Sequence, residues 1–288
     1  MKIPICGTGL SGLVGSRVTE LLQDKYSFND LSLTTGVDIT DYESLEKKIK
    51  EDPSEIIIHM AAKTDVDACE DDKILGEEGT AWVVNVDATR NIVECAQNYG
   101  KKIIYISTDF VFDGTRDFYT EEDLPNPVNW YGVTKFEGER IITESNVSYV
   151  ILRLAYPYRA SYEKKQDFLR RIVDVSKKYQ NITALSDHIF TPTFIDDLAW
   201  VIDFFIQKNL SGIYHAVGSE SLSPLHAAEK ILSALNINAQ IKPILRKDYF
   251  KDRAFRPFKL ALKNDKISRL GLKMLGFSQG LVKIKDFL

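Results

Sequence analysis

Short apolar runs alternate with stretches of helical periodicity through the first half of the chain. The runs expected to form strands are residues 2–6, 31–33, 56–59, 103–107 and 149–152. A first helix is expected to start near Ser11 or Gly12, because Val14, Val18, Leu21 and Leu22 recur at helical spacing. The other stretches expected to form helices are residues 42–50, 80–97 and 130–144. Alternation of this kind predicts βαβ units with right-handed crossovers and a parallel sheet. Pro4 conflicts with this scheme, because a proline in a central strand removes one hydrogen-bond donor.

The pattern changes after Arg153. A charged helix is predicted over residues 162–179, and a strand at 182–184 followed by a helix at 196–206 is expected to return to the sheet. Further helices are predicted at residues 224–235, 265–270 and 280–288. The fold expected is α/β, a Rossmann-like doubly wound parallel sheet with a smaller, discontinuous α+β lobe. Residues 1–154 would form the sheet domain, with a return passage around 180–214, and residues 155–288 mainly the lobe.

A glycine-rich loop follows the first apolar run. Its spacing is Gly9-x-x-Gly12-x-x-Gly15, and a helical pattern begins directly after it. Glycine lets the backbone approach a ligand closely, and a helix start directs free N–H groups toward a pyrophosphate. Strand, glycine loop and helix together predict a dinucleotide site. The cofactor-binding residues expected here are Gly9, Leu10, Ser11, Gly12, Leu13 and Gly15.

Two later segments are expected to meet at the same edge of the sheet. Ser107-Thr108-Asp109 ends an apolar run, and Tyr131 and Lys135 lie one turn apart on a predicted helix. An ammonium group beside a phenol lowers the pKa of the phenol, so Tyr131 is expected to act as an acid or base near neutrality. The pair alone is weak evidence, and the glycine loop gives it weight.

Bulk properties narrow the class of protein. A formal net charge of −4 argues against a general nucleic-acid or membrane-surface binder, and no apolar segment is long enough to span a bilayer. The three cysteines lack Cys-x-x-Cys spacing, and the N-terminus lacks a signal-peptide pattern. These features predict reduced thiols and a cytoplasmic location. The four histidines show no metal-ligand spacing, so no metal is expected. The oligomeric state is not specified, and a homodimer is compatible with the sequence.

Longer motifs carry a family resemblance that runs nearly end to end. The most specific is Ser107-Thr108-Asp109-Phe110-Val111-Phe112-Asp113-Gly114. Others are Ala61-Ala62-Lys63-Thr64-Asp65-Val66-Asp67, Pro127-Val128-Asn129-Trp130-Tyr131-Gly132, Thr191-Pro192-Thr193 and Arg256-Pro257. With the glycine loop, these motifs resemble the extended short-chain dehydrogenase/reductase superfamily and, within it, the dTDP-4-dehydrorhamnose reductase family. The resemblance implies NAD(P)H-dependent reduction of the 4-keto group of a nucleotide-linked deoxysugar.

The resemblance also implies residue roles. Tyr131 would protonate the sugar carbonyl oxygen, Thr108 would donate a hydrogen bond to it, and Lys135 would hold the nicotinamide ribose. Further cofactor contacts would come from Asp38, which suits adenine, and from Ile39, Ala61, Ala62 and Lys63. The residues expected to bind substrate, besides Thr108, are Thr64, Val66, Asp109, Phe110, Tyr156, Arg253 and Arg256.

Some positions depart from the family pattern or allow a purely structural role. Phe110 stands where related dehydratases have an acid, which argues against dehydration. After the second strand, the sequence shows neither the acid that would select NAD nor the arginine that would select NADP. His59 is expected to be a hydrogen-bonded core residue. Asn85 is equally compatible with a backbone contact and with catalytic support, and Arg153 with an ion pair and with a ligand contact. The rival functions are a sugar-nucleotide epimerase and a non-catalytic subunit resembling the regulatory subunit of methionine adenosyltransferase.

Overall fold

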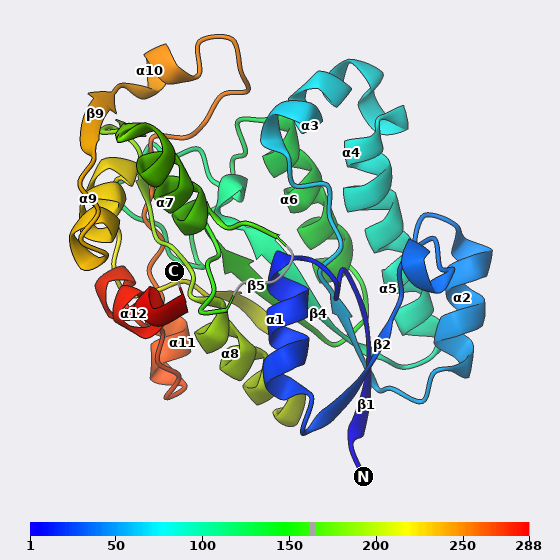
Figure 1. The fold of residues 1–288 in the computed structure, drawn as a ribbon. Coiled ribbons are helices and arrows are strands. Elements are labelled where there is room, and N and C mark those ends of the chain that lie inside the picture. The colour runs from blue at the N-terminus through cyan, green and yellow to red at the C-terminus, as the bar shows by residue number, and fades with distance from the viewer. Residues whose placement is uncertain (162–164, 288) are drawn as a thin grey trace.

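The computed structural model describes residues 1–161 and 165–287. Its centre is a six-stranded parallel sheet with the strand order β2-β1-β3-β4-β5-β8 (Figure 1). Its strands are β1 (Ile3–Thr8), β2 (Tyr26–Asp30), β3 (Ile56–His59), β4 (Lys102–Thr108), β5 (Tyr149–Leu154) and β8 (Gly212–His215). Because the chain places β2 and β3 on opposite sides of β1, ligands are expected at the carboxyl ends of β1 and β3.

Helices cover both faces of this sheet, as the doubly wound prediction requires (Figure 1). One face packs on α1 (Leu13–Leu22) and α8 (Ile195–Gln207), and the other on α2 (Tyr42–Glu51), α5 (Ala88–Asn98) and α6 (Trp130–Thr143). Side chains in β4 alternate between the two cores: Ile104 and Ile106 join the first, Ile103 and Tyr105 the second. Both layers are therefore specified by the period of two in a strand that is buried on both sides.

Elements from the second half of the chain form a smaller lobe with its own apolar clusters. They are α7 (Phe168–Tyr179), β6 (Asn181–Leu185), β7 (Ile189–Phe190), α9 (Pro224–Ala234), β9 (Gln240–Ile244), α10 (Arg246–Tyr249), β10 (Lys259–Leu260) and α12 (Phe277–Ile284). The short helix α11 (Asp265–Arg269) packs on the main sheet, because its Ile267 belongs to the same core cluster as β5 and α8. β6 pairs with β9 and β7 with β10, each pair in parallel. Among the described helices none is long and apolar enough to cross a membrane.

Two strand predictions were wrong. The second strand is β2, and the run at 31–33 leads into a 3₁₀ turn at Leu33–Thr35. In this edge strand, buried and exposed residues alternate, with Tyr26 and Phe28 facing inward. It therefore lacks the continuous apolar run on which the prediction relied. The strand at 182–184 exists as part of β6, but it pairs with β9 outside the main sheet, and the sheet is completed by β8.

Helix boundaries were predicted more closely. Residues 80–97 form a continuous helical stretch made of α4 (Thr80–Trp82), a π-helical segment (Val83–Asp87) and α5. The predicted helix 162–179 is observed from Phe168, and its residues 162–164 lie outside the described part of the chain. The last predicted helix begins earlier, at Phe277, and residue 288 is not described.

The conflict at Pro4 has a simple resolution. The backbone N–H of Ile3 donates to Lys25 and the carbonyl of Gly7 accepts from Leu31, so alternate residues of β1 face β2. Pro4 therefore faces the opposite neighbour, β3, whose pairing with β1 begins only at Cys6. At that point the strand has an open edge, where proline is tolerated.

Candidate active site

The glycine loop joins β1 to α1 at the point where the strand order reverses. Gly9 has φ of +68°, and a Cβ there would lie 2.6 Å from the backbone nitrogen of Ala61, in the segment after β3. A Cβ on Gly15 would lie 2.4 Å from the carbonyl oxygen of Gly9. Helix α1 begins after Gly12, and no side chain caps it. Its first N–H groups therefore suit a pyrophosphate, and the cofactor roles of residues 9–15 stay predictions.

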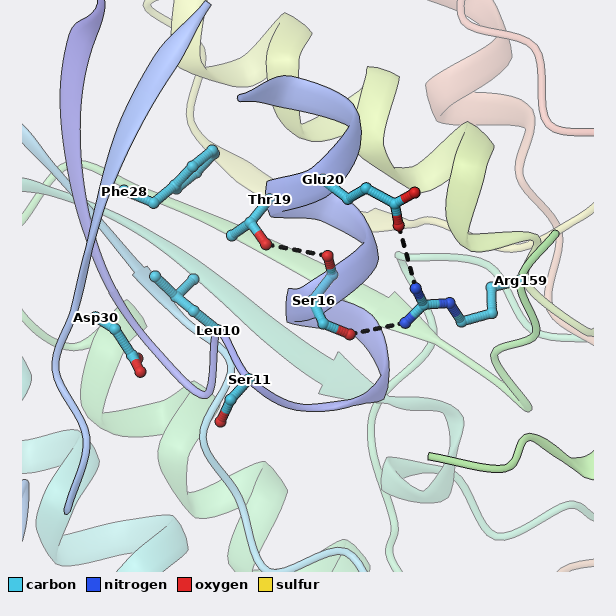
Figure 2. A pocket seen from close by; sticks show the side chains of 8 residues that line it. All are labelled: Leu10, Ser11, Ser16, Thr19, Glu20, Phe28, Asp30 and Arg159. Carbon is cyan, nitrogen blue, oxygen red and sulfur yellow. Dashed lines mark hydrogen bonds and ion pairs between the residues drawn. The ribbon is translucent and has the colours of Figure 1, made fainter. Parts of the chain in front are cut away.

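An acidic residue missed in the sequence lies beside this loop. Asp30 is the last residue of β2 and lines a hollow together with Leu10, Ser11 and Phe28 (Figure 2). One carboxylate oxygen, Oδ2, accepts from the Ser32 hydroxyl at 2.8 Å, and Oδ1 is buried without a hydrogen-bond partner among the described residues. An acid about 20 residues beyond the glycine loop is the usual ribose ligand of NAD. The expectation that this signal is absent was wrong, because the second strand had been misplaced.

A second missed residue, Arg159, fixes the start of α1. Its Nη1 donates to the carbonyl oxygen of Leu13 at 3.3 Å and to the Ser16 hydroxyl at 2.7 Å, and its Nη2 lies 3.3 Å from Glu20 (Figure 2). Arg159 follows β5, some way from α1 in sequence, so no local pattern could have identified the contact. Its partners are protein groups, which indicates a role in anchoring the helix.

Asp38 and Ile39, the predicted adenine contacts, follow the 3₁₀ turn after β2. Asp38 is exposed, and its Oδ1 accepts from the backbone N–H of Thr40 at 2.9 Å and from its hydroxyl at 2.7 Å. The carbonyl oxygen of Ile39 accepts from Asn91 at 3.1 Å. These contacts order the turn, and the cofactor roles of both residues stay predictions.

Thr108, Tyr131 and Lys135 converge at the carboxyl end of β4. Thr108 ends the strand, Tyr131 lies in the first turn of α6, and the Thr108 hydroxyl is near enough to lower the pKa of the Tyr131 hydroxyl. The Thr108 hydroxyl donates to Oδ1 of Asp109 at 3.1 Å. The Lys135 ammonium donates to the carbonyl oxygen of Ile106 at 2.9 Å and lies 4.0 Å from the centre of the Tyr105 ring. All three predicted catalytic side chains are buried.

The electrostatics of this group differ from the sequence expectation in one respect. Burial raises the pKa of Tyr131, and the nearby Thr108 hydroxyl only partly opposes this effect. The expected lowering by Lys135 is not found, because its ammonium faces Ile106 and Tyr105. Tyr131 is thus protonated at neutral pH and has a proton to donate to a carbonyl oxygen.

Burial also lowers the pKa of Lys135 to about 7, against the opposing charge of Glu139. If a charged Lys135 is needed to hold and polarise the reacting groups, turnover should fall as the pH rises through about 7, approaching tenfold per pH unit beyond it. A pH profile of kcat at saturating substrates measures this. A profile that is flat from pH 6 to pH 9 would contradict the need for the ammonium.

Predicted substrate-binding residues gather next to Tyr131. Phe110, Val66 and Tyr156 share its apolar cluster, and the Phe110 and Tyr131 rings lie 5.7 Å apart. Burial raises the pKa of the Asp109 carboxyl to about 7, and its Oδ2 has no hydrogen-bond partner in the described part of the chain. A neutral carboxyl can donate as well as accept a hydrogen bond, which suits a sugar hydroxyl.

Arg253 and Arg256, predicted from the sequence to bind substrate, both approach one acid. Nη1 of Arg256 lies 2.5 Å from Oδ1 of Asp67, and Nη1 of Arg253 lies 4.0 Å from its Oδ2. Asp67 belongs to α3 (Val66–Asp72), whereas both arginines belong to the lobe. Thr64 is exposed in the loop that precedes this helix. The structure therefore brings the predicted lobe arginines to the rim of the sheet domain.

Asn85 links the segment after β3 to α6. Its Oδ1 accepts from the backbone N–H of Lys63 at 2.8 Å, and its Nδ2 donates to the Lys63 carbonyl at 3.1 Å and to the Thr134 hydroxyl at 2.9 Å. It lies in the π-helical segment, a local geometry that is frequent at functional sites. Asn85 thus holds Lys63, a predicted cofactor residue, against the catalytic helix.

His59 is a hydrogen-bonded core residue, as expected. Its Nδ1 lies 2.7 Å from the Thr8 hydroxyl and its Nε2 lies 3.0 Å from the Thr89 hydroxyl. Thr89 donates to the Asn85 carbonyl at 2.7 Å, so the Nε2 proton of His59 is donated to Thr89. Burial lowers the pKa of His59 to about 3, which keeps it neutral.

Known proteins resemble the chain over its whole length. The family model of the RmlD substrate binding domain matches residues 1–286. The solved structure of dTDP-4-dehydrorhamnose reductase from Bacillus anthracis, in complex with NADP, is 30% identical, covers 99% of both chains and superposes with a TM-score of 0.90. The corresponding reductase structure from Yersinia enterocolitica is 28% identical over 100% of both chains, with a TM-score of 0.89. Methionine adenosyltransferase 2 subunit beta of Rattus norvegicus is 31% identical over 92% of this chain and 81% of its own length.

Proposed function

Because this chain belongs to the RmlD substrate binding domain family, we propose that it reduces the 4-keto group of a nucleotide-linked deoxysugar with hydride from NAD(P)H. The observation that carries the proposal is the meeting of Thr108, Tyr131 and Lys135 at the carboxyl end of β4. The glycine loop at the reversal of strand order supports the cofactor half. The proposed reaction needs both features, because the loop would bind the hydride donor and the three side chains would act on the carbonyl group.

Each group of residues has a separate role in the proposed reaction. The backbone of residues 9–15 and the segment 61–63 hold the dinucleotide, which supplies hydride when it is bound. Tyr131 gives its proton to the oxygen of the sugar carbonyl, and the Thr108 hydroxyl stabilises the negative charge that develops on that oxygen. Asp109, Phe110, Val66 and Tyr156 contact the sugar.

A direct assay tests the proposal. Purified protein is mixed with NADH or NADPH and a dTDP-4-keto-6-deoxy sugar, and absorbance at the nicotinamide band is followed. Steady oxidation in proportion to added sugar is expected. An epimerase would interconvert the sugar without net cofactor consumption, and a non-catalytic subunit would show no turnover and would copurify with a methionine adenosyltransferase. Either result would reject the reductase.

Asp30 should set the cofactor preference. Its buried carboxylate oxygen can accept from a ribose 2′-hydroxyl but repels the 2′-phosphate of NADPH. We expect kcat/KM to be at least about tenfold higher with NADH than with NADPH, and Asp30→Ser to reduce that ratio to within about threefold. Equal use of both cofactors by the unaltered protein would contradict the assignment.

The cellular setting follows from the same proposal. The three cysteines, Cys6, Cys69 and Cys95, are buried free thiols, which suits the reducing cytoplasm where nucleotide sugars are made. A homodimer stays a prediction, and light scattering of the purified protein tests it.

A further inference from the structure

The segment 254–258 of the lobe is bound to the sheet domain by polar contacts of successive residues. The Ala254 N–H donates to Oδ1 of Asp67 at 3.1 Å, the Phe255 carbonyl accepts from Asn129 at 2.9 Å, and Arg256 pairs with Asp67. The Pro257 carbonyl lies 2.9 Å from the Nδ1 of His188. The segment thus spans from α3 to α6 and back to the lobe.

Asn129 has two partners at this junction. It is the N-cap of α6, where its Oδ1 accepts from the Gly132 N–H at 2.9 Å. Its Nδ2 donates to the Phe255 carbonyl, so one planar amide joins the catalytic helix to the lobe segment. Only one orientation of the amide satisfies both partners, since an N–H needs an acceptor and a carbonyl needs a donor. The side chain is 2% exposed, so water cannot replace either bond readily.

Helix α3 closes the junction from the third side. Its Asp67 holds the lobe segment, and its Glu70 accepts from the backbone N–H of Trp130, the first residue of α6, at 2.7 Å. Trp130 and Gly132 flank Tyr131, and a Cβ on Gly132 would lie 2.3 Å from the Phe110 carbonyl oxygen. The first turn of α6 is therefore held from several sides, and Asn129 is its direct link to the segment that carries Arg256.

We propose that Asn129 is a positioning residue that couples the seating of the nucleotide-sugar by segment 254–258 to the placement of the Tyr131 hydroxyl. This inference rests on the proposed function for its substrate. Binding energy from the nucleotide end, delivered through Arg256, is transmitted through the Asn129 amide to the first turn of α6. Energy from a remote part of a substrate can be used in this way to orient the reacting groups.

Two substitutions separate the link from the cap. Asn129→Asp keeps the acceptor for Gly132 and replaces the donor to Phe255 with a carboxylate oxygen, and Asn129→Ser keeps a hydroxyl cap that is too short to reach Phe255. Ser223→Ala is the matched control, because Ser223 caps α9 in the lobe and contacts none of the proposed site residues. Asp67→Asn weakens the second hold on the segment.

Both Asn129 variants should lower dTDP affinity, measured by calorimetry, and kcat, measured with the keto sugar, by about tenfold each. NADH affinity should stay within twofold, and the melting temperature should fall no further than in Ser223→Ala. Combining Asn129→Ser with Asp67→Asn should cost less than the product of the two single effects, because both hold one segment. Unchanged dTDP affinity and kcat in Asn129→Asp would overturn the proposal. It would also be overturned if the Asn129 variants lost NADH affinity as strongly as dTDP affinity and had a melting temperature well below that of Ser223→Ala. An unaltered protein that binds dTDP but reduces no keto sugar would reject the reductase, and with it the coupling to Tyr131.

Discussion

Replacing Tyr131 with phenylalanine should lower kcat by at least about 10²-fold and leave the affinity for NAD(P)H within twofold. The phenyl ring would keep its place against Phe110, 5.7 Å away, and in the apolar cluster that contains Val66 and Tyr156. The only group removed is the hydroxyl, which burial keeps protonated. Negative charge would then develop on the carbonyl oxygen as hydride adds to the carbon, with no proton donor to neutralise it.

The measurement compares kcat at saturating sugar with cofactor affinity measured by fluorescence titration. Tyr158→Phe is a matched control, because the Tyr158 hydroxyl is also buried but has no hydrogen-bond partner among the described residues and lies in the lobe core. It should retain near-normal turnover. If Tyr131→Phe keeps more than about a tenth of the activity, the proton donor is another group, and Asp109 is the next candidate because of its raised pKa.

Local features of the site were predictable from the sequence because they are properties of consecutive residues. The glycine spacing requires close backbone packing that only glycine allows, and the Tyr131–Lys135 spacing puts both on one face of a helix. This reasoning failed at β2, because its buried and exposed residues alternate and do not form an apolar run. The end of the strand was therefore misplaced, and Asp30 was not recognised as a candidate ribose ligand.

Contacts between segments far apart in the sequence were not predictable. Asp67 and Arg256 are both visible as charges, but their pairing depends on how the lobe returns over α3. The same holds for Asn129 and Phe255, and for β6, which has strand-forming residues yet pairs with β9 instead of the main sheet. Periodicity reports which face of an element is buried, and it carries no information on the partner.

Replacing Arg153 with methionine should lower the free energy of unfolding by about 3–5 kcal/mol. Nη2 of Arg153 lies 2.6 Å from Oε2 of Glu139 and its Nε lies 2.9 Å from Oε1, with both side chains 2% exposed. The Ser107 hydroxyl donates to the same Oε1 at 2.5 Å. Arg153 and Glu139 therefore form a structural ion pair. Removing the Arg153 cation leaves the Glu139 carboxylate buried, with the Ser107 hydroxyl as its remaining partner.

The double variant Arg153→Met/Glu139→Gln separates the contribution of the ion pair to stability from its effect on the pKa of Lys135. Replacing both charges removes the uncompensated carboxylate, so urea unfolding should recover most of the lost stability, whereas additive losses would contradict the ion-pair account. Activity should not recover in parallel. Glu139 lies one turn from Lys135 on α6 and raises its pKa, so without that charge the ammonium loses its proton at a lower pH. The alkaline limb of the kcat profile should move to lower pH in the double variant, which makes the pair a support for Lys135 that a stable apolar replacement cannot reproduce.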